Sequence, residues 1–448
     1  MLRSTVRIAT LVVLVIAAPA RAQQVTAVTH AVLIDGNGGE PVPDAVVVIR
    51  GSVIEVVGPA RSVLVPRSAN VIDAHGRTLM PGLADMHVHL MGGWDGEHVD
   101  MLGYQRYLNS LLYAGVTTVL DMGNVHPYIQ QLRHEIAAGR ILGPRIYLAG
   151  PVMDGPDPFW PPISYVVSSE AQLPSYVNQL KMARVDVVKA YVGLSERLLT
   201  GLVREASKES LRVFVHSWSL GSADVVRTGI AAFAHVDYDL PLSDETVQLM
   251  RQRGVAAITT LATIESLSRR RLADLTFLSG PLVARVTRPQ FLAALRTMAS
   301  GGPTPAESSA MVSGSTHLHT DMRNVKRLID SGVLVAAGTD APYPGVFLGE
   351  GLHRELELLV EAGLTPLQAI SVATKNAALL MEDTTWGTIT VGKRADLLII
   401  NGDPAHRIAD SRNIEMVILR GQVLNRRKLE FDPISDPGFE VTGSVARP

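Results

Sequence analysis

Short apolar runs separated by amphipathic stretches fill the middle of this 448-residue chain. Eight of the runs are continuous rather than alternating, which is typical of parallel strands buried on both faces. They span residues 82–90, 116–122, 145–150, 186–192, 212–218, 230–237, 255–260 and 333–340. Helix-like stretches separate them, including residues 198–210, 244–253, 322–330 and 350–361. Eight strands that alternate with helices predict an α/β fold, a (β/α)₈ TIM barrel.

Glycines punctuate this pattern where a helix should end. Gly115, Gly229, Gly254 and Gly332 each stand just before a predicted strand, the position of a helix C-cap. An open doubly wound sheet is the alternative fold. Its phosphate-binding signature is missing, because residues 36–39 do not complete the pattern G-x-G-x-x-G.

The two ends of the chain have a different texture, rich in β-branched residues. Strands are expected at residues 28–34, 45–49, 53–57, 387–389, 395–400 and 414–419. We therefore predict a small composite β-sandwich built from both termini. The expected divisions are a signal peptide at 1–22, the first part of the sandwich at 23–78, the barrel at 79–382, and the second part with a C-terminal tail at 383–448.

The first 22 residues have the three-part pattern of a secretory signal peptide. Arg3 and Arg7 precede an apolar run at residues 8–18, and Ala20-Arg21-Ala22 follows as a small-x-small cleavage site. The apolar run is too short to span a bilayer as a helix, although an uncleaved membrane anchor is the alternative. We expect cleavage after Ala22 and a periplasmic or secreted protein that does not contact the membrane.

Composition narrows the chemistry. The chain has 41 Lys and Arg against 43 Asp and Glu, a formal net charge of −2. Because basic residues are not in excess, we expect no nucleic-acid partner. It contains no cysteine, which excludes disulfides, cysteine nucleophiles and thiolate-bound metals. A metal must therefore be held by His, Asp, Glu or a modified side chain.

Metal-competent side chains stand near the carboxyl ends of five of the eight predicted strands. This end of a TIM barrel carries the catalytic groups. Strand alternation places both histidines of the first strand on one face. The residues, in chain order, are His87, His89, Lys189, His216, His235 and Asp340. A glycine, Gly338, precedes the aspartate and is expected to leave room beside it for substrate.

Two longer motifs carry a family resemblance. Residues 79–89 read LMPGLADMHVH and residues 387–397 read GTITVGKRADL. Together with the order of the metal-competent residues, they resemble the amidohydrolase superfamily of metal-dependent hydrolases, over about residues 25–424. The closest branch is the prolidase- and imidazolonepropionase-like one. The resemblance implies a distorted barrel, a β-sandwich from both termini and a binuclear metal site with a carboxylated lysine.

The resemblance also implies a role for each residue. His87 and His89 look like ligands of one metal, and His216 and His235 like ligands of the second. Lys189 resembles the lysine that carries a carbamate derived from carbon dioxide and bridges the metals. Asp340 looks like the last ligand and the proton-transferring carboxylate. One departure is Trp218, which stands where this branch often has another histidine on the fifth strand.

The residues fit this chemistry on physical grounds. A lysine must lose its proton before it can become a carbamate, and burial in an apolar strand favours the neutral amine. Histidine and oxygen ligands without thiolate suit two Zn²⁺ ions, with other divalent metals as alternatives. The predicted reaction is hydrolysis of an amide-type C–N bond by a hydroxide that bridges the metals. The substrate would be an N-acyl amino acid, a dipeptide or a cyclic amide. A mononuclear deaminase or a lactonase is the alternative.

Substrate clues are few. Tyr191 shares a face with Lys189, and Trp160 lies in a proline-rich stretch at 151–165, so both are candidate substrate contacts. A basic stretch at 264–320 favours a small-molecule substrate with a carboxylate, or is a solvated helical insertion. His317 and His319 repeat the H-x-H spacing in an expected loop. We also expect a homo-oligomer.

Overall fold

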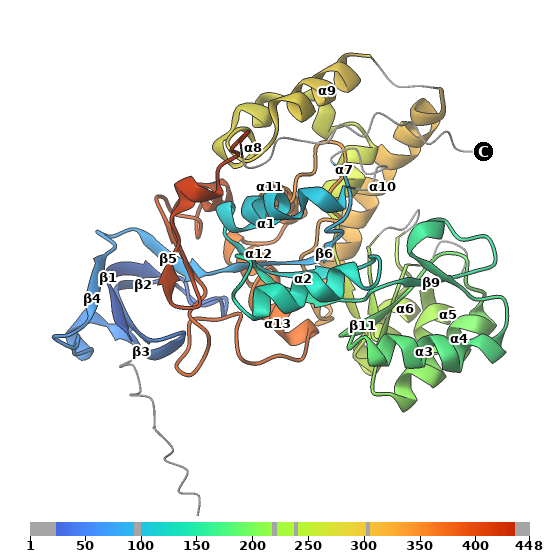
Figure 1. Cartoon of the computed structure of the whole chain (residues 1–448), viewed down its shortest axis with the longest axis horizontal. Helices are drawn as coiled ribbons and strands as arrows, with labels where there is room; N and C mark the ends of the chain where they lie inside the picture. Colours follow the sequence, from blue (N-terminus) through green and yellow to red (C-terminus); the bar gives the residue numbers. More distant parts are fainter. Residues whose placement is uncertain (1–23, 94–99, 217–221, 237–240, 302–304, 435–448) are drawn as a thin grey trace, which may run out of the picture.

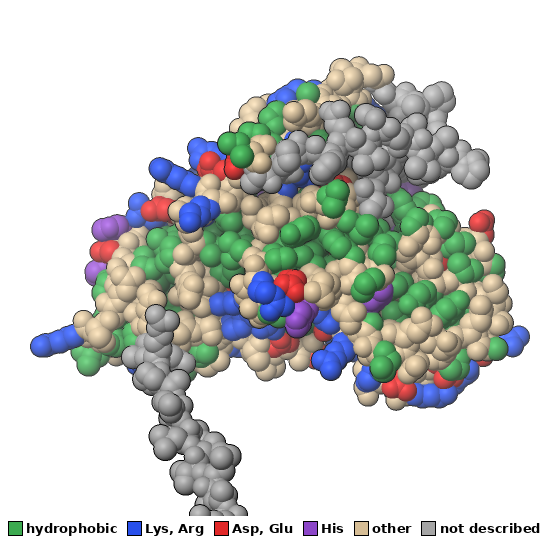
Figure 2. Space-filling view, viewed as in Figure 1, with side chains coloured by type: hydrophobic (Ala, Val, Ile, Leu, Met, Phe, Trp, Pro, Cys, Tyr) green, Lys and Arg blue, Asp and Glu red, His purple; other side chains and the backbone are tan. Residues whose placement is uncertain are grey.

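A computed structural model describes residues 24–93, 100–216, 222–236, 241–301 and 305–434. The predicted signal peptide and Trp218 lie outside these residues. Within them, no helix is both long and apolar enough to cross a membrane. Basic and acidic side chains are interspersed over the face shown in Figure 2.

A barrel of parallel strands forms the centre of the molecule (Figure 1). Each predicted strand region contains one strand: β6 (Leu83–Val88), β7 (Val116–Asp121), β8 (Arg145–Leu148), β11 (Val187–Ala190), β12 (Arg212–Val215), β13 (Ala232–Phe233), β14 (Ala256–Ile258) and β15 (Val335–Ala336). The strands are shorter than predicted. In several of them the hydrogen bonding to the neighbouring strand ends before the polar residues at the end of the predicted run.

The barrel closes through two interrupted seams, which make it distorted. The sheets β6–β8 and β11–β15 meet where the Asp186 N–H donates to the Leu148 carbonyl at 2.9 Å. They meet again where the Met86 N–H donates to the Ala337 carbonyl at 2.9 Å. Closure rules out the open doubly wound sheet and confirms the predicted fold class. Two outer strands, β9 (Val152–Asp154) and β10 (Ser164–Val166), extend the sheet beside β11.

Helices cover the outside of the barrel. They are α1 (Tyr104–Tyr113), α2 (Tyr128–Ala137), α3 (Leu173–Met182), α4 (Glu196–Lys208), α5 (Ser222–Arg227), α6 (Asp244–Arg253), α7 (Leu261–Leu267), α10 (Pro305–Asp330), α11 (Glu350–Glu361), α12 (Pro366–Val372) and α13 (Lys375–Leu380). The predicted bounds of α6 and α11 are confirmed, whereas α10 begins well before residue 322. The four predicted C-cap glycines all have positive φ, and Gly254 ends α6 in the left-handed region.

The basic stretch between α7 and α10 forms a helical insertion at the top of Figure 1. Its elements are η5 (Arg271–Ala273), η6 (Thr276–Ser279), α8 (Pro281–Ala284) and α9 (Pro289–Ser300). Three arginines of the stretch are paired with glutamates of other segments. Arg270 binds Glu361, Arg271 binds Glu350, and Arg285 binds Glu430. These pairs offset part of the positive charge of the stretch.

Strands from both ends of the chain form one β-domain. The N-terminal strands are β1 (Val25–Leu33), β2 (Val42–Arg50), β3 (Val53–Pro59), β4 (Asn70–Asp73) and β5 (Thr78–Pro81), and the C-terminal strands are β16 (Leu397–Ile400), β17 (Ile414–Leu419) and β18 (Gln422–Val423). β5 pairs antiparallel with β16, so this seam joins the two ends. The strand predicted at residues 387–389 is wrong, because this stretch forms no strand. β1 pairs with β4 along its first half and with β5 along its second half, so the sheet forks there.

A buried histidine behind the barrel gives the fold an acid-sensitive point. His353 on α11 is fully buried, and its ring bonds to the Ala114 carbonyl at 2.9 Å and the Ser411 hydroxyl at 2.8 Å. Burial and the nearby Arg412 charge lower its pKa to about 4. In the unfolded chain the pKa returns to about 6.5. The unfolded state therefore takes up the proton first as the pH falls.

Because of this difference in pKa at His353, we expect the free energy of unfolding to fall by about 2 kcal/mol between pH 7 and pH 5. Urea unfolding of wild type and His353→Gln at both pH values measures this. The variant is less stable at pH 7 but should lose less stability on acidification. His406→Gln, at an exposed position, is the control and should behave as wild type. Equal losses in wild type and His353→Gln would contradict the prediction.

Candidate metal centre

Strand alternation builds an apolar plug inside the barrel and a polar layer above it. Val187 in β11 and Phe214 in β12 point into the barrel and are fully buried. Two residues further along each chain segment, Lys189 and His216 continue on the same side. The side chains between them face the surrounding helices. The polar groups therefore lie at the carboxyl ends of the strands, above an apolar core.

The structure brings the six predicted site residues into one cluster. His87 and Lys189 lie within strands, whereas His89, His216, His235 and Asp340 lie just beyond strand ends. Ligand atoms of His87, His235 and Asp340 all lie within 4.8 Å of one another. His89 joins through Asp340, with 3.1 Å between His89 Nε2 and Asp340 Oδ1. His216 joins through His235, with ring centroids 4.2 Å apart.

The ring of His87 is oriented by its outer nitrogen. Nδ1 lies 2.8 Å from the Ala234 carbonyl oxygen, which can only accept, so Nδ1 carries the proton. Complete burial, together with the positive charges of Lys189 and His89, lowers the pKa of His87 well below its usual value. The ring is therefore neutral, and Nε2 presents a lone pair.

That lone pair faces another acceptor. Nε2 of His87 is 3.2 Å from Oδ1 of Asp340, so two electron-rich atoms point at each other. Such an arrangement is unfavourable in a buried site unless a cation lies between or beside the two atoms. The donor set of imidazole nitrogens and a carboxylate oxygen suits a divalent transition metal. The residues present thus fit a metal.

Lys189 is the least expected member of the cluster. Its side chain is 1% exposed, and Nζ lies 3.5 Å from Nε2 of His87. Burial lowers the pKa of Lys189 to about 7, against the opposing effect of Asp340. A substantial fraction of the amine is therefore neutral at neutral pH, as carbamate formation requires.

The remaining histidines differ in charge. Burial and the neighbouring cations lower the pKa of His216 and of His235 well below the usual value. His235 Nδ1 bonds to the Thr260 hydroxyl at 3.0 Å, which leaves Nε2 directed elsewhere. Burial opposes charge on His89, but the hydrogen bond and charge of Asp340 outweigh it and raise the pKa of His89.

Asp340 is held in an uncommon backbone conformation. It has a φ of 61°, in the left-handed region that non-glycine residues seldom adopt. The preceding Thr339 is fixed by Asp85, whose carboxylate accepts from the Thr339 N–H at 3.0 Å and from its hydroxyl at 2.7 Å. The same carboxylate accepts from the His87 N–H at 3.3 Å. Asp85 therefore ties the first and last strands together beside the site.

One expectation about this turn is wrong. Gly338 was expected to leave room for substrate, but a Cβ there would lie 2.5 Å from Ile258 and 2.9 Å from His87. The glycine instead lets the last strand approach the first closely enough to bring Asp340 next to His87.

Comparison with known proteins settles the family. The sequence profile of the Amidohydrolase family matches residues 78–424. The chain belongs to the amidohydrolase family. As an amidohydrolase it is a hydrolase of amide-type bonds, in a family that is typically metal-dependent.

Individual amidohydrolases support the predicted branch. An imidazolonepropionase from Deinococcus radiodurans is 25% identical over 388 residues, covering 82% of this chain and 88% of the relative. An ochratoxinase from Aspergillus niger is 26% identical over 442 residues, covering 86% of this chain and 83% of the relative. The solved structure of a Xaa-Pro dipeptidase with bound methionine superposes with a TM-score of 0.71 at 21% identity, over 90% of this chain and all of the other. The predicted superfamily and branch are confirmed.

Several residues around the amidohydrolase site were missed in the sequence. Asp121, the fully buried last residue of β7, accepts from the Leu90 N–H at 2.9 Å and supports the loop whose Gly123 carbonyl holds His89 at 3.0 Å. Glu355 on α11 is buried and accepts from the Leu261 and Ala262 N–H groups at 3.0 and 2.7 Å. Asp121 and Asp85 could have been identified from the sequence, because each is a carboxylate inside an apolar run. Glu355 gave no signal, since α11 contains several glutamates.

The other candidate residues have clear positions. Tyr191 lies beside the site, with its ring centroid 5.2 Å from that of His216, and Trp160 packs nearby in the same apolar cluster. His317 and His319 were expected in a loop, but they lie within α10. Two residues apart on a helix they point about 200° apart, so they cannot share one ion.

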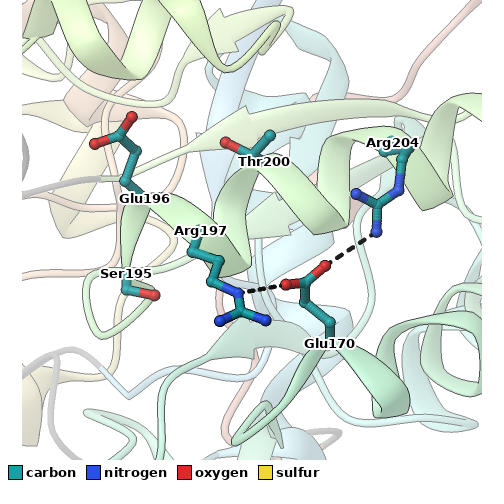
Figure 3. A pocket seen from close by; sticks show the side chains of 6 residues that line it. All are labelled: Glu170, Ser195, Glu196, Arg197, Thr200 and Arg204. Carbon is teal, nitrogen blue, oxygen red and sulfur yellow. Dashed lines mark hydrogen bonds and ion pairs between the residues drawn. The ribbon is translucent and has the colours of Figure 1, made fainter.

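A surface hollow of about 470 Å³ contains none of these residues. Figure 3 shows Arg197 and Arg204 of α4 flanking Glu170, which binds both at 2.6 and 3.1 Å. Because these charges satisfy one another in an exposed ion-pair cluster, we assign the hollow no part in the chemistry.

Proposed function

We propose that the protein is a metal-dependent hydrolase that cleaves an amide-type C–N bond in an N-acyl amino acid, a dipeptide or a cyclic amide. The observation that carries the proposal is the lone pair of His87 facing the Asp340 carboxylate beside a buried lysine. This arrangement suits a cation and is costly without one. Ester or lactone hydrolysis by the same groups is the second candidate, because both reactions begin with attack on a carbonyl.

Each residue of the cluster has a proposed role. His87 and His89 would hold one divalent ion and His216 and His235 the other, and Lys189, as a carbamate, would supply oxygen ligands. When bound, the metals, which we propose are Zn²⁺, supply a polarised carbonyl and a water of lowered pKa. Asp340 binds metal and takes part in proton transfer.

The protein groups move the proton. The Asp340 carboxylate is placed to accept a proton from the attacking water and to return it to the leaving nitrogen. Its Oδ1 contacts both His87 and His89, which fixes the carboxylate against rotation. Its side chain is 22% exposed, so it lies where the cluster opens toward solvent and substrate.

Metal content tests the proposal. Purified enzyme should contain about two divalent ions per chain and should hydrolyse members of a panel of N-acyl amino acids, dipeptides, lactams and lactones. Removal of metal by a chelator should abolish turnover, and Zn²⁺ should restore it. Saturation at one ion with full activity and ammonia release would favour the mononuclear deaminase instead.

We also propose that the chain is exported and loses residues 1–22. The basic, apolar and small-residue order of that segment supports the proposal. Protein recovered from the periplasm should begin at Gln23. Cytoplasmic protein that retains Met1 would contradict it.

A further inference from the structure

A row of aromatic rings runs away from the proposed metal site. The ring of Tyr191 lies 5.2 Å from that of His216, and Phe159 lies 6.1 Å beyond Tyr191. Trp160 adjoins Phe159 at 5.7 Å and packs in the same apolar cluster as Tyr191. These centroid distances are those of rings in contact. We call Tyr191, Phe159 and Trp160 the aromatic row.

The aromatic row connects a buried apolar cluster to solvent. Tyr191 and Trp160 are partly buried against Met91, Val152 and Ile163. The Phe159 side of the row is open, because that residue is 47% exposed. A large apolar side chain at the surface is unremarkable by itself, but here it continues a line of rings that begins at a metal-site histidine.

One buried carboxylate holds the aromatic row in place. Asp154, at the end of β9, is fully buried. Its Oδ1 accepts from the Gly155 and Gly193 N–H groups, each at 2.8 Å, and its Oδ2 accepts from the Phe159 N–H at 2.8 Å. These contacts fix the segment carrying Phe159 to the turn that follows Tyr191.

The two glycines make this approach feasible. A Cβ on Gly155 would lie 2.1 Å from the Gly193 carbonyl oxygen, so the two backbones touch. Without the Asp154 carboxylate, three buried or partly buried N–H groups would lack an acceptor there. Asp154 thus couples the loop after β9 to the segment after Lys189 in β11.

We propose that the aromatic row is a substrate subsite for a flat apolar group, such as a phenyl ring near the scissile carbonyl, and that Asp154 is its positioning residue. The row offers ring faces and aliphatic surface, and the Asp154 oxygens are already occupied by N–H donors. A planar apolar group is the complement of such a surface. The inference rests on the proposed function, because it places the group beside the metal.

Two metal-chelating probes separate the subsite from the metal chemistry. Acetohydroxamate and benzohydroxamate carry the same chelating group and differ in a methyl or a phenyl. We would measure their Kd for the metal-loaded enzyme by calorimetry, with metal content determined in each preparation. Wild type should bind benzohydroxamate about tenfold more tightly, as one well-packed aromatic contact provides.

Phe159→Ala should lose most of this phenyl preference while the Kd of acetohydroxamate and the metal content stay unchanged. The position is exposed, so the variant should fold. Leu379→Ala is the matched control, since Leu379 is also 47% exposed but lies on α13, outside the row. It should keep the wild-type preference.

Asp154→Asn tests the positioning residue. An amide cannot accept hydrogen bonds at both of its terminal atoms, so the Phe159 N–H loses its partner. The phenyl preference should fall with metal content unchanged, a selective effect that general destabilisation would not produce. Equal affinity of wild type for both probes, or an unchanged preference in Phe159→Ala, would overturn the subsite and leave the proposed metal chemistry standing. A protein that takes up no metal from solution and binds neither probe would overturn both.

Discussion

Replacing Lys189 with alanine is expected to give a protein that folds but holds less metal and has almost no turnover. The side chain is buried among the proposed ligands, 3.5 Å from His87 Nε2. Its loss removes the proposed bridge between the metals. Because bound metal contributes several kcal/mol to stabilising a hydrolytic transition state, kcat should fall by about 10³-fold or more.

The experiment couples kcat with metal analysis of the same sample. Added acetate or another short carboxylic acid should restore part of the activity of Lys189→Ala by replacing the carbamate oxygens. Lys208→Ala, on the exposed face of α4, is the control and should behave as wild type. A Lys189→Ala enzyme with two metals and full activity would refute the bridge.

Asp340→Asn should retain metal yet lose most of its activity. Asparagine keeps the size of the side chain and one oxygen that can face His87 and His89. It cannot take up a proton at neutral pH, so proton transfer to the leaving nitrogen fails. A general acid–base group of this kind typically contributes about 10²–10⁴-fold to kcat.

The decisive measurement is again kcat together with metal content. Asp403→Asn changes an exposed carboxylate of the C-terminal segment and should leave both values unaltered. If Asp340→Asn holds two metals and turns over at nearly the wild-type rate, the proton must travel through another group.

The barrel could be predicted from the sequence because each of its strands lies in an apolar run, and four of these runs follow a helix-ending glycine. The bounds of α6 and α11 followed from amphipathic periodicity and capping residues. Strand ends could not be predicted as well. His235 and Asp340 belong to apolar runs but lie beyond β13 and β15, because tertiary contacts pull these residues out of the ladder.

The six site residues could be predicted as a group because barrel topology places strand ends on one rim. Their supporting residues could not, since a hydrogen bond such as that from Thr339 to Asp85 joins strands at opposite ends of the barrel sequence. The left-handed backbone conformation of Asp340 and Thr260 could not be predicted from the sequence either. Aspartate tolerates that conformation better than most residues and the β-branched threonine hardly at all, but neither residue type predicts it, so the surrounding contacts decide it.

The seam between β5 and β16 has a consequence for the order of events during synthesis. Thr78–Pro81 leaves the ribosome long before Leu397–Ile400 exists, so one edge of β5 stays unpaired while the whole barrel sequence is made. Unpaired strand edges recruit other chains, and pairings this distant in sequence form slowly. A chain that stops short of β16 keeps that edge open permanently. We therefore expect chains truncated before β16 to aggregate rather than to fold into an inactive enzyme.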